Sequence, residues 1–148
     1  MYDLRAVPER SGLDPAVLSR LPLHARHFEY AEERTDGRLY ARLRIPPDEM
    51  VWEPSVIVMP RGGALELELV NDDLNTHCAL LPSNGDPQFL WLPNQSRGTA
   101  SLELDGPGCY WFSSVIGNDE GGGLVGAIVV LGEAPPEARL DRPSQARA

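Results

Sequence analysis

The chain contains no lysine: all 13 of its basic residues are arginine, and 22 acidic residues give a formal net charge of −9 over 148 residues. An acidic protein repels phosphate backbones, so we exclude nucleic acid as a partner. Cysteine is also scarce, and two residues cannot build a disulfide scaffold. No apolar run approaches the roughly 20 residues that a membrane-spanning helix needs, so no membrane span is expected.

The first ten residues, MYDLRAVPER, are too polar for a secretory signal peptide. We therefore expect a cytoplasmic protein as the sequence stands. An exported protein is the alternative, if the natural chain carries a leader that this sequence lacks. A cytoplasmic location agrees with reduced cysteines.

Charge is unevenly distributed along the chain. Residues 1–45 and residues 134–148 each carry one more arginine than acidic residues, whereas residues 46–133 carry two arginines and 13 acidic residues. This shift predicts three parts. They are an N-terminal extension over 1–45 that packs on the core, a central domain over 46–133, and a flexible tail over 134–148.

Within the extension, the sequence predicts a short helix followed by a β-hairpin. Residues 13–20 open with an Asp-Pro pair, in which aspartate suits the helix N-cap and proline the first turn. Residues 27–33 and 38–45 flank a Thr-Asp-Gly turn at 35–37. Apolar residues alternate with arginine and tyrosine over 38–45, so we expect the arginine face of that strand to be solvated.

The central domain has the pattern of short strands separated by turns rich in glycine and proline. Residues 64–70 alternate leucine with glutamate, which predicts a strand with one buried face and one solvent-exposed face. Other short apolar runs lie at 55–59, 77–81, 99–104, 109–114 and 127–131. This spacing favours an all-β domain, an antiparallel sandwich or barrel.

Three segments resemble the cupredoxin (plastocyanin/azurin) family. PSVIVMPRGG at 54–63 is similar to that family's strand and glycine turn, and residues 69–77 resemble its strand-Asn-loop-His segment. GCYWFSSVIGN at 108–118, followed by LVGAIVV at 124–130, resembles the closing hairpin that carries the other copper ligands. The resemblance covers roughly residues 50–131 and implies an antiparallel Greek-key β-sandwich.

Members of that family hold type 1 copper with two histidines, a cysteine thiolate and usually a methionine, a ligand set suited to one-electron transfer. By resemblance, His77 falls at the first histidine and Ser114 at the cysteine. Asn118 stands near the second histidine, and Leu124 replaces the methionine. Serine does not ionise at neutral pH and leucine offers no donor. The resemblance therefore implies a degenerate site for which we expect no metal, with His77 as the ligand if copper binds.

The remaining cysteines and histidines do not restore this ligand set. Strand alternation turns Cys109 away from Ser114, and Cys78 away from His77. These cysteines either pair or stay as buried free thiols, and free thiols are our interpretation. His24 and His27 are interpreted as surface histidines. Residues 118–120, Asn-Asp-Glu, are interpreted as a solvated acidic loop.

Residues 89–92, Phe-Leu-Trp-Leu, are apolar at every position, so a strand with one wet face cannot bury them all. Either the N-terminal extension covers them, or Phe89, Trp91 and Leu92 form a docking surface. In the resembled family, redox partners dock near the metal-end loops. The resemblance thus implies a protein partner, with a redox enzyme as a candidate.

Three functions stay open at this point. The first is a cupredoxin-like module that has lost type 1 copper and serves as a binding or accessory protein for a protein partner or small ligand. The second is a copper-binding electron-transfer or copper-handling protein with an unusual site around His77, using Cys78, Cys109 or Met59. The third is an enzyme that uses the vacated pocket, with His77 as its general base.

Overall fold

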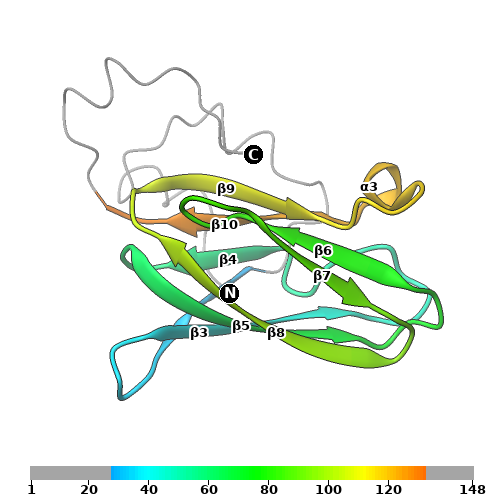
Figure 1. Cartoon of the computed structure of the whole chain (residues 1–148), viewed down its shortest axis with the longest axis horizontal. Coiled ribbons are helices and arrows are strands. Elements are labelled where there is room, and N and C mark those ends of the chain that lie inside the picture. The colour runs from blue at the N-terminus through cyan, green and yellow to red at the C-terminus, as the bar shows by residue number, and fades with distance from the viewer. Residues whose placement is uncertain (1–27, 133–148) are drawn as a thin grey trace.

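The computed structural model describes residues 28–132, which form a two-layered β-sandwich (Figure 1). Sheet A has the strand order β1-β4-β10-β9-β6-β7, and sheet B has the order β2-β3-β5-β8. The strands are β1 (Phe28–Tyr30), β2 (Glu32–Glu33), β3 (Leu39–Ile45), β4 (Val56–Met59), β5 (Gly63–Asn71), β6 (His77–Leu81), β7 (Gln88–Leu92), β8 (Ser96–Leu104), β9 (Gly108–Ser113) and β10 (Val125–Val130). One short helix, α3 (Asp119–Gly122), follows β9. The predicted all-β sandwich is confirmed.

The sheets are mixed, which corrects the prediction of an antiparallel sandwich. β3 pairs in parallel with β5, and β4 pairs in parallel with both β1 and β10. The chain passes from β3 in sheet B to β4 in sheet A and back to β5 in sheet B. Because a strand in the opposite layer separates β3 from β5, the two run in the same direction.

Residues assigned to the N-terminal extension take part in both sheets, so the sandwich begins before residue 46. β1 lies at an edge of sheet A, and β3 lies inside sheet B. β2 and β3 form a hairpin at the predicted turn, where Gly37 has a φ of 87°. The arm predicted over 27–33 is divided between the sheets, because β1 pairs with β4 instead. Outside the described residues lie the predicted helix over 13–20, His24, His27 and the tail over 134–148.

The core fills the space between the sheets and follows the predicted alternation. In β5, Leu65, Leu67 and Leu69 are at most 1% exposed, while Glu66 and Glu68 face outward and are half-buried. Removing a leucine side chain from water contributes about 1.5–3 kcal/mol to stability. The leucine face of β5 is thus one of the main sources of stability in the sandwich.

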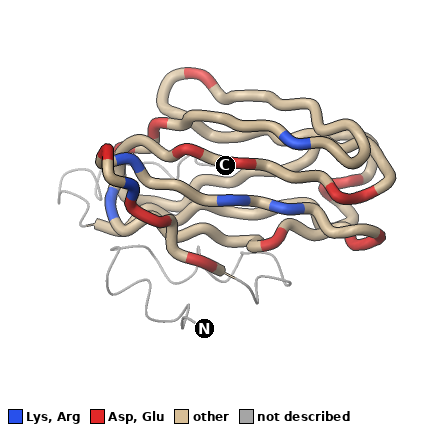
Figure 2. Tube along the Cα trace, turned by 90° about the horizontal axis from the view of Figure 1, so that it is seen from below, with Lys and Arg blue, Asp and Glu red and all other residues tan. Residues whose placement is uncertain are grey.

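The outer face of sheet B carries cross-strand ion pairs. Arg38 pairs with Glu66, Arg42 pairs with Glu68, and Arg44 contacts two carboxylates. Figure 2 shows arginine and acidic positions side by side on this face. The arginine side chains stay 38–53% exposed, as predicted for a solvated face. Each such pair contributes at most about 1 kcal/mol, so this face is solvated and its charges are largely compensated within it.

We predict that Leu67→Ala lowers the free energy of unfolding by about 2–5 kcal/mol, since it leaves a cavity between the sheets. Urea denaturation followed by tryptophan fluorescence measures the loss. Glu49→Ala, at an exposed loop position, is the matched control and should change stability by less than about 0.5 kcal/mol. Equal effects of the two substitutions would contradict this account of the core.

Candidate functional site

His77 opens β6 and is buried, with 1% of its surface exposed. Its Nε2 lies 2.7 Å from Oδ2 of Asp73, and its Nδ1 lies 2.7 Å from Oδ2 of Asp119. Both ring nitrogens therefore face carboxylate oxygens, and only the imidazolium form can donate to both at once. We call His77, Asp73, Asp119 and Ser114 the His77 cluster.

Asn71, the last residue of β5, organises the loop that leads to His77. Its Oδ1 accepts a hydrogen bond from the backbone N–H of Asp73 at 2.9 Å. Its Nδ2 donates to the carbonyls of Asn75 and Leu92, both at 2.9 Å. An asparagine that bonds the backbone two residues later forms a tight turn. This turn aims the Asp73 carboxylate at His77.

Ser114 and Asp119 close the cluster from the β9 side. Ser114 directly follows β9, and Asp119 opens α3. The Ser114 Oγ donates to Oδ2 of Asp119 at 2.6 Å and accepts the backbone N–H of Cys78 at 3.1 Å. The same Asp119 oxygen is thus bonded to both His77 and Ser114. Charge-assisted hydrogen bonds of this kind are the strong ones.

The two aspartates set the protonation of the cluster. Burial alone lowers the pKa of His77, but the hydrogen bonds and charges of Asp119 and Asp73 outweigh burial, so the pKa is raised above its ordinary value. The hydrogen bond with His77 lowers the pKa of Asp73 to about 2, although burial opposes it. The backbone N–H groups of Asp48 and Leu74 add to this lowering. The arrangement therefore favours an imidazolium between two carboxylates.

Of the four residues predicted for the former metal pocket, the structure joins His77 and Ser114 through Asp119. Leu124 adjoins Ser114 through the backbone, since its carbonyl accepts the Ser114 N–H at 3.1 Å, and its side chain is fully buried in the core. Asn118 is exposed, and its backbone carbonyl accepts the N–H of Gly122 in the turn of α3. Asn118 thus lies outside the cluster.

Sequence reasoning missed both aspartates of the cluster. Asp119 belongs to the segment 118–120 that we interpreted as a solvated loop, and this is wrong for its side chain, which is 13% exposed and bonded twice. Asp119 lies 42 residues from His77, so no local pattern links them. Asp73 had a usable signal, because it precedes His77 by four residues in the Asn-loop-His segment.

Cys78 and Cys109 are both buried, and no disulfide joins them. Cys109 belongs to a second apolar cluster on the outer side of sheet A. Cys78, which was predicted to point away from His77, lies beside Ser114. Its Sγ accepts the backbone N–H of Val115 at 3.2 Å and lies 3.7 Å from Oγ of Ser114. β9 ends beside β6, so the chain after it meets both Cys78 and the cluster.

Two aromatic side chains are exposed on β7, the edge strand of sheet A. Phe89 is 47% exposed and Trp91 is 60% exposed, and their rings meet edge to face at 5.3 Å. Leu80 of β6 lies opposite Phe89 in the strand register and is 38% exposed. We call Leu80, Phe89 and Trp91 the β7 patch. Leu92 was predicted to join this surface, but it is fully buried, because alternate residues of β7 face the core.

A groove of about 650 Å³ opens beside the β7 patch. Its lining residues come from β6, the following loop, β9, α3 and the start of β10, with Leu104 of β8. His77 is not among these lining residues. In the described part of the chain, this groove therefore does not lead to the His77 ring.

Residues 28–132 contain no group of three or more histidine, cysteine, aspartate or glutamate residues placed to hold a metal ion. The helix of this region is too short to cross a membrane, and no other helix there could do so.

Comparison with protein families assigns the chain to a family by its sequence. A family model described as PQQ-associated matches residues 6–148, almost the whole chain. The protein belongs to the PQQ-associated family. No curated protein matches it significantly.

The solved structures that resemble this PQQ-associated protein have the cupredoxin-like fold, which confirms the resemblance in fold. Auracyanin from Roseiflexus castenholzii is 14% identical, with a TM-score of 0.55 over 65% of this chain and 97% of that one. The metal-binding domain of the Cu(I)-exporting ATPase CopA from Streptococcus pneumoniae D39 is 14% identical, with a TM-score of 0.56 over 72% and 97%. A multicopper oxidase gives 17% identity and a TM-score of 0.56 over 86% and 54%.

The pKa shifts predict a stability maximum in mildly acidic solution. The raised pKa of His77 adds stability that is fully present below its ordinary pKa of 6.5 and is lost as pH rises through the raised value. The lowered pKa of Asp73 adds stability that is present above 3.8 and is lost as pH falls toward about 2. Urea denaturation at a series of pH values measures the loss of stability on both sides of the maximum.

His77→Gln should reduce the loss of stability on the alkaline side of this maximum, since glutamine does not titrate. His24→Gln, which replaces a histidine outside the described residues, is the matched control. It should lose stability at alkaline pH as the natural chain does. An identical pH dependence of the natural chain and His77→Gln between pH 6 and pH 9 would contradict the charged cluster.

Proposed function

We propose that the protein is a copper-free, cupredoxin-like accessory subunit that binds a redox enzyme through the β7 patch. The position of Asp119 is the main observation that supports the loss of copper. Its Oδ2 is bonded to His77 and to Ser114, the two residues that the resemblance assigns to one metal. A carboxylate thus stands between the two former ligand positions.

The donors at the matched positions do not fit type 1 copper. That centre needs a soft thiolate in a trigonal set with two imidazoles. Here the thiolate position holds the hydroxyl of Ser114, and the methionine position holds Leu124, whose side chain packs in the core. Asn118, near the position of the second histidine, is exposed. Both nitrogens of His77 are engaged by carboxylates, which also leaves no free general base there for the enzyme alternative.

The family description supports a partner that uses PQQ. PQQ, pyrroloquinoline quinone, is a tricarboxylate, and a chain with a net charge of −9 repels such an anion. The association named by the family is therefore better explained by contact with a PQQ-dependent enzyme than by direct binding of the cofactor.

The β7 patch is the surface best suited to that contact. Exposed aromatic residues in a contiguous group mark protein interfaces. Val115, whose N–H contacts Cys78 opposite Trp91, is also exposed, at 42%. Leu74, in the loop before β6, is 68% exposed. The outer face of sheet B is less suited, since its charges are largely compensated by one another. The His77 cluster fixes the start of β6, which carries Leu80 of the patch.

We predict that the purified chain binds neither Cu(I) nor Cu(II) stoichiometrically with micromolar or tighter affinity. Elemental analysis and visible spectroscopy after copper titration measure this. Weak binding that is lost in a His24→Ala and His27→Ala double variant, and kept in His77→Ala, would be adventitious. One copper per chain with an intense visible band, lost in His77→Ala, would overturn the copper-free proposal.

We predict that Trp91→Ala and Phe89→Ala weaken binding to a purified PQQ-dependent enzyme from the same organism by about ten-fold or more, as aromatic interface anchors do. Surface plasmon resonance measures the affinity. Both side chains are exposed, so the fold should persist, and thermal unfolding checks it. Arg97→Gln, on the outer face of sheet B and 66% exposed, is the control and should bind as the natural chain does. Unchanged affinity of both aromatic variants would exclude the β7 patch as the surface that binds the enzyme.

A further inference from the structure

We propose that the groove between β6 and β9 binds a small organic cation, an apolar molecule that carries one ammonium or guanidinium group. This inference does not rest on the partner enzyme or on the state of the copper site. It rests on the way the strands separate, on the lining of the groove and on its single charge.

The groove exists because β6 and β9 stay together at one position only. Leu80 pairs with Ser113, and no other pair of these two strands is in register. Beyond it, the loop over 82–87 is tied to sheet B. The Asn84 N–H donates to the carbonyl of Glu103 at 2.7 Å. The N–H of Glu103 in turn donates to a serine hydroxyl of the loop at 3.0 Å. The loop is therefore held away from β9, and the gap does not depend on a ligand.

The walls of the groove are apolar and partly aromatic. Leu80, Pro82 and Pro87 line one side, and Tyr110 and Trp111 line the other. The Tyr110 hydroxyl donates to a backbone carbonyl at 2.6 Å, which fixes the orientation of its ring. Rigid walls reduce the entropy lost on binding. Aromatic faces also attract cations.

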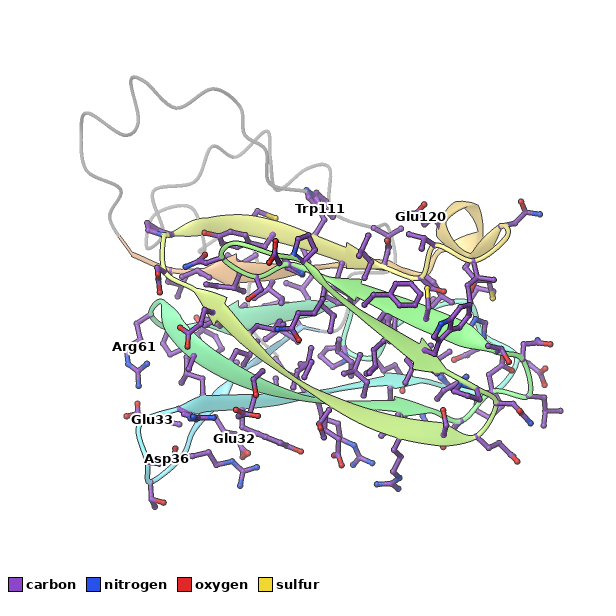
Figure 3. All side chains as sticks on the ribbon, viewed as in Figure 1. Glu32, Glu33, Asp36, Arg61, Trp111 and Glu120 are labelled. Atoms are coloured by element: carbon purple, nitrogen blue, oxygen red, sulfur yellow. The ribbon has the colours of Figure 1, made fainter. Side chains whose placement is uncertain are left out.

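Glu120 gives the groove its charge. Of the described residues that line the groove, it is the one that carries a charge. Ser113 donates to its Oε2 at 2.9 Å, which holds the carboxylate at the end of β9. Figure 3 shows Trp111 and Glu120 on the same outer side of β9. An anion is repelled here, whereas a cation can contact the carboxylate while its apolar body lies against the walls.

Three probes of similar shape test the proposal: 2-phenylethylammonium, neutral 2-phenylethanol and anionic 3-phenylpropionate. Each is titrated into the full-length, ¹⁵N-labelled chain and followed by NMR. The ammonium probe should shift the backbone signals of Leu80 and Ser113 and the indole signal of Trp111. It should bind at least about three-fold more tightly than the alcohol, as expected for a partly exposed ion pair. The anion should bind more weakly than the alcohol.

Two carboxylate variants separate the charge from the fold. Glu120→Gln should abolish the preference for ammonium and leave the affinity for the alcohol unchanged, which shows that the groove is intact. Glu49→Gln, at an exposed loop position outside the groove, should keep the preference.

Three outcomes would overturn the proposal. They are no shift at millimolar ammonium probe, shifts confined to residues outside the groove, and an ammonium preference that persists in Glu120→Gln.

Discussion

The imidazolium of His77, held between two carboxylates, is the interaction on which one end of the sandwich depends. It joins the loop after β5, the start of β6, and α3, while Ser114 ties in the end of β9. Removing one member of a buried charged network leaves the others uncompensated, which commonly costs about 3–5 kcal/mol. The segments that the cupredoxin resemblance assigns to a metal are thus connected here by one imidazolium and two carboxylates.

The sequence predicted those features that depend on local periodicity. The leucines of β5 alternate with glutamate, and the structure buries them as expected. The resemblance also placed His77 and Ser114 near one another, and a single Asp119 oxygen bonds both. These predictions are correct because hydrophobic periodicity determines which face a strand buries, and the order of the strands along the chain determines which of them end together.

The features that the sequence did not predict depend on distant pairing. Asp119 stands in a run of polar residues that looks solvated, and it faces His77 because the end of β9, which leads into α3, lies beside β6. The run at 89–92 is apolar throughout, so its composition does not say that Leu92 faces the core while Trp91 faces solvent. Pairing of β7 with β6 decides that. Likewise, parallel pairing of β3 with β5 leaves no signature in either strand.

The passage of the chain from β3 to β4 to β5 has a consequence for how the molecule forms. The neighbours β3 and β5 of sheet B are separated in the sequence by β4 of sheet A, so neither layer can be completed by pairing consecutive segments alone. Contacts of this non-local kind slow the search for the native state. Each layer therefore depends on the other for its completion, and we expect the chain to fold more slowly than a sheet of the same size built from consecutive hairpins.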